Sequence, residues 1–192
     1  MGAQPTASAT NRREAILEAA LDLFRQRGYH SVGIDEIGTA AGISGPGVYR
    51  HFANKAALLV ALFDSITERM LAAGEQIQKK EGPPGEVLDR LVTFHVATAV
   101  RERGLLAVWI QDWRSLPPAD EHRIRRRQVE YTAIWVTALA GLRPELGSAQ
   151  AETVVHAALG AVNSVALADT GLEPSELEKV LGAAARAVLT GG

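Results

Sequence analysis

The dominant feature of the sequence is a series of apolar runs at helical spacing, separated by glycine or proline and without strand-like alternation. Alanine and leucine dominate the apolar residues and aromatic residues make up only 5%, a composition that favours helices. We therefore predict an all-α fold of about nine helices. In the first run, four residues share one helical face before Gly28 stops the pattern: Ile16, Ala20, Leu23 and Phe24.

Capping residues and breaks set the expected boundaries. Asn11 with Glu14 forms a capping signature at the first helix, and Ser44 and Asn54 can cap the third and fourth. Three helices are expected between residues 11 and 53: one that ends at Gly28, a short one at about Asp35–Ala41, and a third capped by Ser44. The others are expected at about 54–80, 85–101, 104–115, 119–142, 149–169 and 175–189.

Charge and cysteine content exclude several classes of protein. With 20 basic and 22 acidic side chains, the net charge is −2, too acidic for a protein that coats nucleic acid by bulk charge. The absence of cysteine excludes disulfides, thiolate zinc sites and a cysteine nucleophile. The N-terminus has no apolar signal core, and the apolar stretches are shorter than the ~20 residues of a membrane span. These features predict a cytoplasmic protein without membrane contact.

No catalytic or metal-binding motif is visible. The sequence has no phosphate loop, no Gly-x-Ser-x-Gly and no His-Glu-x-x-His, and no two of its five histidines are four residues apart. We predict no enzyme activity, no cofactor and no metal site.

A helix-turn-helix pattern lies between residues 28 and 55. Two short expected helices flank a tight turn at Ala41–Ser44, in which Gly42 supplies the left-handed residue. Ile37, Ile43 and Val48 would hold the two helices together. The alternative is an ordinary helical hairpin whose glycine and proline only make the turn.

Charge placement favours the DNA-binding interpretation. No acidic residue lies between Glu36 and Asp64, and that window contains Arg50, His51 and Lys55. A slightly acidic chain has thus no acidic group in the segment that would face phosphates.

Residues 37–44 read IGTAAGIS and residues 48–55 read VYRHFANK. They resemble the pattern Ile-Ala-x-x-Ala-Gly-Val-Ser, then Leu/Val-Tyr-x-His-Phe-x-x-Lys, of the TetR family of bacterial transcriptional regulators. The resemblance is strong over residues 11–63 and architectural beyond them. It implies a flexible arm at 1–10, a helix-turn-helix DNA-binding domain at 11–53, and an effector-binding and dimerisation domain at 54–192.

Two departures from the family pattern bear on DNA readout. Gly33 stands where Ser or Thr usually caps the second helix. Gly45-Pro46-Gly47 opens the recognition helix where many members carry polar side chains, so base readout would rest on backbone approach, Pro46 and Arg50.

Side-chain chemistry and the matched positions give the candidate DNA contacts. Arg50 is the candidate for a base edge, and Lys55→Ala is expected to lower the salt dependence of binding by about one unit of slope. Tyr49 could instead pack on the first helix, and His51 could be a helix-terminal cap. The full candidate set is Arg12, Arg13, Thr39, Ser44, Gly45, Pro46, Gly47, Tyr49, Arg50, His51 and Lys55.

The middle helices combine aromatic and polar side chains, as a small-molecule pocket requires. The resemblance implies an effector pocket there, although ordinary core packing is the alternative for any one residue. The candidate ligand residues are Phe94, His95, Trp109, Gln111, Trp113, Tyr131, Trp135 and Asn163.

The last two helices, about 149–169 and 175–189, have apolar and small-residue stripes that suggest a four-helix interface between two subunits. The resemblance implies the same homodimer, which would match a palindromic operator. An intramolecular bundle is the alternative.

Arg123, Arg125, Arg126 and Arg127 form a basic run that is either a solvated face or an anchor for an acidic ligand such as an acyl-coenzyme A. The resemblance favours a dimeric repressor released from its operator by a hydrophobic or acyl-CoA-like effector. The alternatives are an activator or ligand-independent regulator, and a small helical enzyme or carrier.

Overall fold

The computed structural model describes residues 7–80 and 82–191, and these residues form helices without a strand. The all-α prediction is therefore confirmed. The helices are α1 (Ala7–Arg27), α2 (Ile34–Ala40), α3 (Gly45–Tyr49), α4 (Lys55–Lys79), α5 (Pro84–Arg101), α6 (Arg103–Asp112), α7 (Pro118–Leu142), α8 (Ser148–Asn163) and α9 (Pro174–Thr190). Three 3-10 turns join them: η1 (Tyr29–Ser31), η2 (Trp113–Ser115) and η3 (Ser164–Ala166).

Helix ends agree with the caps expected near the turn and differ elsewhere. Ser44 and Asn54 cap α3 and α4, where their side chains accept from the backbone N–H of Gly47 and Ala57. The first boundary was wrong, because α1 begins at Ala7 and Asn11 lies inside it. The rest of the predicted arm, residues 1–6, lies outside the described residues. At the other end, α8 stops at Asn163 and continues only as η3.

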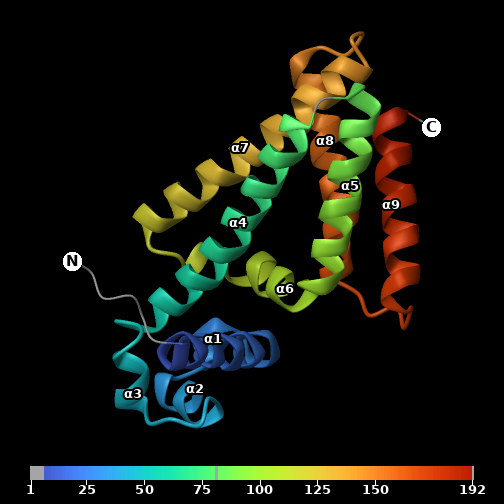
Figure 1. Cartoon of the computed structure of the whole chain (residues 1–192). Coiled ribbons are helices and arrows are strands. Elements are labelled where there is room, and N and C mark those ends of the chain that lie inside the picture. The colour runs from blue at the N-terminus through green and yellow to red at the C-terminus, as the bar shows by residue number, and fades with distance from the viewer. Residues whose placement is uncertain (1–6, 81, 192) are drawn as a thin grey trace.

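Figure 1 shows α1 to α3 as a small unit below the longer helices, with α4 rising from it. The lower half of α4 lies above α1, and its upper part runs beside α7. Helices α5, α8 and α9 form a bundle on the other side, and α6 crosses between that bundle and α1. Helix α4 therefore contacts both the small unit of α1 to α3 and the longer helices α5 and α7.

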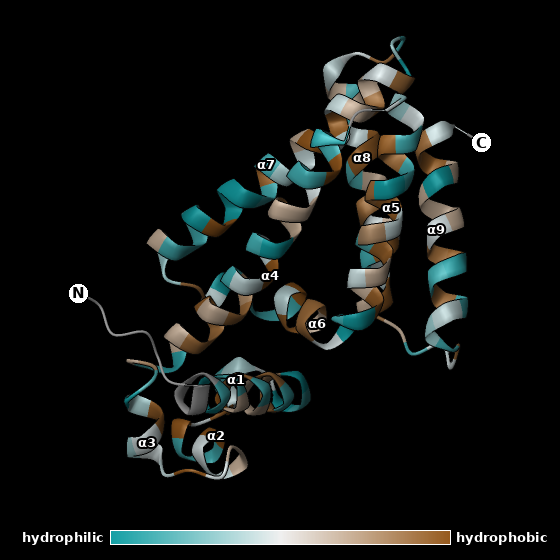
Figure 2. Cartoon of the chain, viewed as in Figure 1, coloured by the Kyte–Doolittle hydropathy of each residue, from teal (hydrophilic) through white to brown (hydrophobic). Residues whose placement is uncertain are grey.

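Two apolar cores hold the helices together. The boundary between these cores does not fall at residue 53, because one of them contains residues from both sides of it. One core joins Phe24 and Ile37 of the small unit to Phe63 of α4, Val108 of α6 and Ile124 of α7. The other fills the bundle of α5, α7, α8 and α9. Figure 2 shows apolar positions along α5 and α8, whereas the N-terminal half of α7 carries hydrophilic ones. The shared core mechanically links the small unit to α4 and α6.

Candidate functional site

The turn between α2 and α3 is closed by glycines. Gly42 has φ 68°, and Ile43 donates from its N–H to the Gly38 carbonyl at 2.9 Å. Gly45 is buried against α2, and a Cβ built there would lie 1.8 Å from Asp35 Oδ1. Gly45 therefore lies inside the turn, and its contact with DNA remains a prediction.

The outward face of α3 carries Pro46, Tyr49 and Arg50, all exposed. Tyr49 is 55% exposed, so it does not pack on α1 as the alternative had it. The Ser44 hydroxyl accepts from Gly47 N–H at 3.3 Å and keeps its own hydrogen for another acceptor. This face is a short, protruding surface with one cation and two hydroxyl groups.

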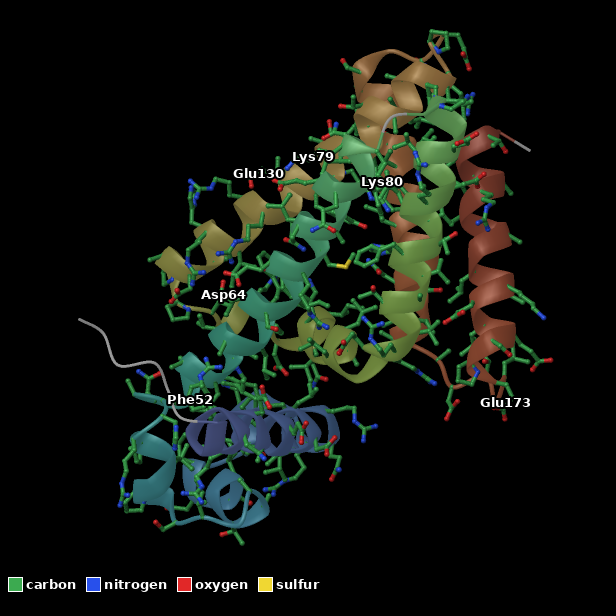
Figure 3. All side chains as sticks on the ribbon, in the orientation of Figure 1. Phe52, Asp64, Lys79, Lys80, Glu130 and Glu173 are labelled. Carbon is green, nitrogen blue, oxygen red and sulfur yellow. The ribbon has the colours of Figure 1, made fainter. Side chains whose placement is uncertain are left out.

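Other candidates border this surface. Thr39 is exposed on α2, but its hydroxyl donates to the Asp35 carbonyl at 2.9 Å. Arg12 and Arg13 are exposed on α1, and the Arg13 guanidinium lies 4.9 Å from the centre of the Phe52 ring. Figure 3 shows Phe52 in the segment between α3 and α4, so Arg13 is held next to that segment.

Lys55 binds backbone carbonyl oxygens. Its ammonium group donates to the carbonyl oxygens of Tyr29 at 2.8 Å, Val32 at 2.8 Å and His30 at 3.4 Å. It also lies 4.4 Å from the centre of the Tyr29 ring. Three carbonyls use the three donors of the ammonium group, so Lys55 fastens η1 to the start of α4, and its phosphate contact remains a prediction.

A second connection joins η1 to α6. The buried Asp112 carboxylate accepts from Tyr29 N–H at 3.3 Å, and Ser115 lies 3.0 Å from His30 Nε2. Burial and then the Asp112 charge raise the pKa of Tyr29. The segment Tyr29–Val32 is thus held by α4 on one side and by the α6 end on the other.

The arginine run of α7 pairs with acidic groups and neither of its two interpretations describes it fully. Arg123 and Arg127 both bind Asp64 of α4, and Arg127 also binds Glu68 at 2.8 Å. Hydrogen bonds to Asp64 and Asp120 raise the pKa of Arg123. Figure 3 shows Asp64 on α4 beneath the α7 ribbon. These pairs bridge two helices.

Among the described residues, the other two arginines of the run form their ion pairs and cation–π contact within α7 and η2. Arg125 binds Glu121 at 3.2 Å and lies over the Trp113 ring at 4.7 Å. Arg126 is exposed and lies 3.8 Å from Glu130. The run is therefore engaged with carboxylates and an aromatic ring, and no arginine of it lines the cavity described next.

A cavity of about 150 Å³ lies among α4, α5, α6, α7 and α8. Four of the predicted ligand residues line it, namely His95, Trp109, Tyr131 and Asn163. Sequence reasoning missed others, including Thr98 of α5 and Glu102 directly after that helix. These two follow His95 at positions i+3 and i+7 and share its helical face, a signal that was available.

The other four predicted ligand residues lie elsewhere. Phe94 borders a separate shallow hollow, Gln111 is exposed beside Gly28, and Trp113 lies under Arg125. Trp135 is fully buried, edge-on to the rings of His95 and Tyr131. Sequence reasoning could not separate these four residues from the cavity wall, because i, i+4 pairing shows which residues share a face but not which neighbour that face meets.

His95 is the centre of a buried polar cluster at the cavity wall. Its Nε2 lies 3.1 Å from Asn163 Oδ1 and its Nδ1 lies 3.3 Å from the Tyr131 hydroxyl. Since a carboxamide oxygen only accepts, Nε2 carries the hydrogen and Nδ1 accepts from the tyrosine. Burial lowers the pKa of His95 to about 4 against an opposing effect of the Asn163 bond, and burial raises the pKa of Tyr131.

Helices α8 and α9 each have one face in the core and one outside. Val155 and Val162 of α8 are buried within the chain, whereas the small residues Ala157 and Gly160 are exposed. A Cβ built at Gly160 would meet nothing within 4 Å. On α9, Val180 is 57% exposed. The outer faces of these helices thus offer close approach to another surface.

Two family models match the chain. The model of bacterial regulatory proteins of the tetR family matches residues 16–62, and that of the tetracyclin repressor-like C-terminal domain matches residues 81–167. This chain belongs to the TetR family. The first match contains the turn and both of its helices, and the second contains most of the cavity wall.

Named relatives of this TetR-family chain are transcriptional regulators, in line with the prediction that it is not an enzyme. An HTH-type transcriptional regulator of Mycobacterium tuberculosis is 34% identical over 131 residues, which are 67% of the chain and 61% of that relative. The transcriptional activator FasR of Mycolicibacterium smegmatis is 38% identical over 65 residues, 34% of the chain and 30% of FasR. The chain thus spans less than two thirds of both relatives.

A solved structure confirms the fold over nearly the whole chain. AibR, crystallised with isovaleryl coenzyme A and operator DNA, has a TM-score of 0.76 at 20% identity, over 90% of this chain and 97% of AibR. Among the helices described, none is both long and apolar enough to cross a membrane. Within the same residues, no group of three or more His, Asp or Glu side chains is placed to hold a metal ion.

Proposed function

We propose that this TetR-family protein is a homodimeric transcriptional regulator that binds a palindromic operator and responds to a small effector in the cavity. The observation that carries the proposal is the exposed face of α3, where Pro46, Tyr49 and Arg50 protrude from a segment free of acidic residues. A helix that presents a few side chains from such a turn fits the major groove.

Within this proposal the contacts divide into two kinds. Arg50 and Pro46 would read base edges, since guanidinium pairs with guanine and a pyrrolidine ring can touch a thymine methyl. The remaining surface residues would bind phosphates and set the register. They are Arg12, Arg13, Thr39, Ser44, Gly47, Tyr49 and His51. Gly45 is left out because it is buried in the turn, and Lys55 because it binds carbonyl oxygens at η1.

The cavity would act on the DNA surface through α4 and α6. Ile66, Thr67 and Met70 of α4 line the cavity, and the same helix begins at Lys55 beside η1. Helix α6 lines it with Trp109 and ends at Asp112, which binds Tyr29. A ligand that moves either helix would change the spacing of two recognition helices, with a coupling of roughly 1–3 kcal/mol.

The direct test is an electrophoretic mobility shift with DNA that flanks the protein's own gene, at several salt concentrations and with added metabolites. We expect salt-sensitive binding of a symmetric site and release of the DNA by one compound class. The name of FasR favours activation as the second candidate. In that case a compound would strengthen binding or leave it unchanged while transcription rises.

Lys55→Ala is expected to destabilise the fold instead of weakening phosphate contact. The carbonyl oxygens of Tyr29 and Val32 would lose their donor, at a cost of about 1–3 kcal/mol in unfolding free energy. Urea denaturation measures this loss, and a titration at several salt concentrations checks that the salt slope is unchanged. Unchanged stability with a slope lower by about one would restore Lys55 as a phosphate contact.

His95 is expected to make stability depend on pH. Its folded pKa of about 4 is below the ordinary 6.5, so the unfolded chain takes up the proton first as the pH falls. The contribution is complete above pH 6.5 and is lost between 6.5 and about 4, amounting to about 3 kcal/mol. Denaturation across this range, compared with His95→Gln, measures it. An equal pH dependence in both proteins would contradict the assignment.

A further inference from the structure

The size of the cavity limits what it can hold. At about 150 Å³ it matches the engineered cavities that accept benzene, and it is smaller than the usual pockets for drug-sized ligands. A coenzyme A moiety does not fit inside the enclosed part of this cavity, which is open to the surface on one side. The structure thus admits a compact molecule.

The charges around the cavity restrict the ligand further. Among the residues that line it none is Lys or Arg, and the single charged group is the Glu102 carboxylate. Glu102 already binds Arg69 at 3.0 Å and Arg101 at 3.4 Å. A buried anion would lie near a carboxylate without a counter-charge, and a buried cation would have to displace an arginine, so either charge costs free energy.

The arginines of α7 do not change this balance. Arg123 and Arg127 are engaged with Asp64, and Arg127 also with Glu68, on the other face of α4. His95 cannot supply a positive charge either, because its ring is buried and its two nitrogens are bound to Tyr131 and Asn163.

One polar group of the wall lacks a partner. Thr98 lines the cavity, is 5% exposed, and its Oγ1 is buried without a hydrogen-bond partner among the described residues. The Asn163 amide NH₂ adds a donor at the same wall, since its oxygen is used by His95. An unsatisfied buried hydroxyl costs about 1–3 kcal/mol unless a ligand pairs with it. Because the Thr98 Oγ1 atom has less than 1 Å² of accessible surface, this pairing requires a rotation of the Thr98 side chain toward the cavity.

We infer that the effector of this protein is a compact, uncharged molecule with an apolar body and one hydrogen-bonding end that pairs with the Thr98 hydroxyl. This inference rests on the proposed function, in that it assigns the chemical class of the effector. Carboxylates and coenzyme A thioesters lie outside that class. The acyl-CoA ligand suggested by the sequence run at Arg123–Arg127 is thus replaced by a neutral one.

Matched probes test the inference with the full chain. Benzyl alcohol, benzoate and benzylammonium share one ring and differ in charge, and Trp109 at the wall reports binding by fluorescence. We expect benzyl alcohol to bind at least about tenfold more tightly than either ion or butyryl-CoA. Equal or tighter binding of benzoate or of the thioester, or no binding of the alcohol, would overturn the inference.

Two variants separate the hydroxyl from general packing. Thr98→Val is expected to weaken the binding of benzyl alcohol by roughly tenfold and to leave the binding of toluene unchanged. It should also raise the stability of the ligand-free protein, because a buried unpaired hydroxyl is removed. Thr137→Val, on the exposed face of α7, is the control and should change none of these. Equal loss for alcohol and toluene would contradict the role of Thr98.

Operator binding is read separately in the absence of any probe. If no DNA fragment is shifted, the proposed function is refuted. The order in which the probes bind would still be a test of the cavity. A shifted operator together with preferential binding of benzoate would refute only the neutral effector.

Discussion

Gly160→Glu is expected to turn the protein into a monomer and to lower its operator affinity by on the order of a thousandfold, the gap between specific and non-specific binding. Gly160 is exposed on α8, within the face proposed to meet the second subunit. A Cβ there meets nothing within 4 Å, so the isolated chain tolerates the change. In the proposed dimer, each new carboxylate would be buried in the interface without a partner.

Sedimentation equilibrium and the mobility shift measure the two effects on the same preparation. Val129→Glu is the matched control, since Val129 is 63% exposed on α7 and the same charge is added away from the interface. It should remain a dimer that binds the operator. A Gly160→Glu protein that stays dimeric and binds normally would show that another surface joins the subunits.

Arg50→Ala is expected to cost roughly 1–3 kcal/mol at each half-site, with lost discrimination at one base pair and little change in salt slope. Arg50 is exposed at the end of α3, where a guanidinium can reach a guanine edge. Unfolding free energy should be unchanged, because the side chain protrudes from the fold.

Binding to a set of operators with single base changes measures this effect. Arg126→Ala is the control, because this substitution removes an equal charge. Arg126 is exposed on α7 and lies far along the chain from the turn. Uniform weakening across all operators together with a lower salt slope would make Arg50 a phosphate contact instead of a base reader.

The turn and its helices could be predicted because their signals are local. Gly42 and the Ser44 cap act within a few residues, so sequence order is enough to place them. The contacts of Lys55 could not be predicted because its carbonyl partners lie 23 to 26 residues earlier and are set by how α4 meets η1. The burial of Gly45 could not be predicted for a related reason, since its contact with Asp35 depends on the angle between α2 and α3.

The sequence predicted some of the residues that line the cavity but not others. Helical spacing identified aromatic faces, but it did not show that the Trp135 face turns into the core while that of Trp109 borders a cavity. The ion pairs from α7 to Asp64 were hidden for the same reason, because their partners are about 60 residues apart. Local chemistry can be read from order in the chain, whereas the identity of the opposing helix cannot.

The most direct test of the account is the stoichiometry and salt dependence of the complex with a two-fold symmetric DNA fragment from beside the gene. The account predicts two chains per duplex, with an association constant that falls steeply as salt rises, and weaker, less base-selective binding when Arg50 is replaced by Ala. A single chain per duplex, or salt-independent binding that ignores the face of α3, would contradict it.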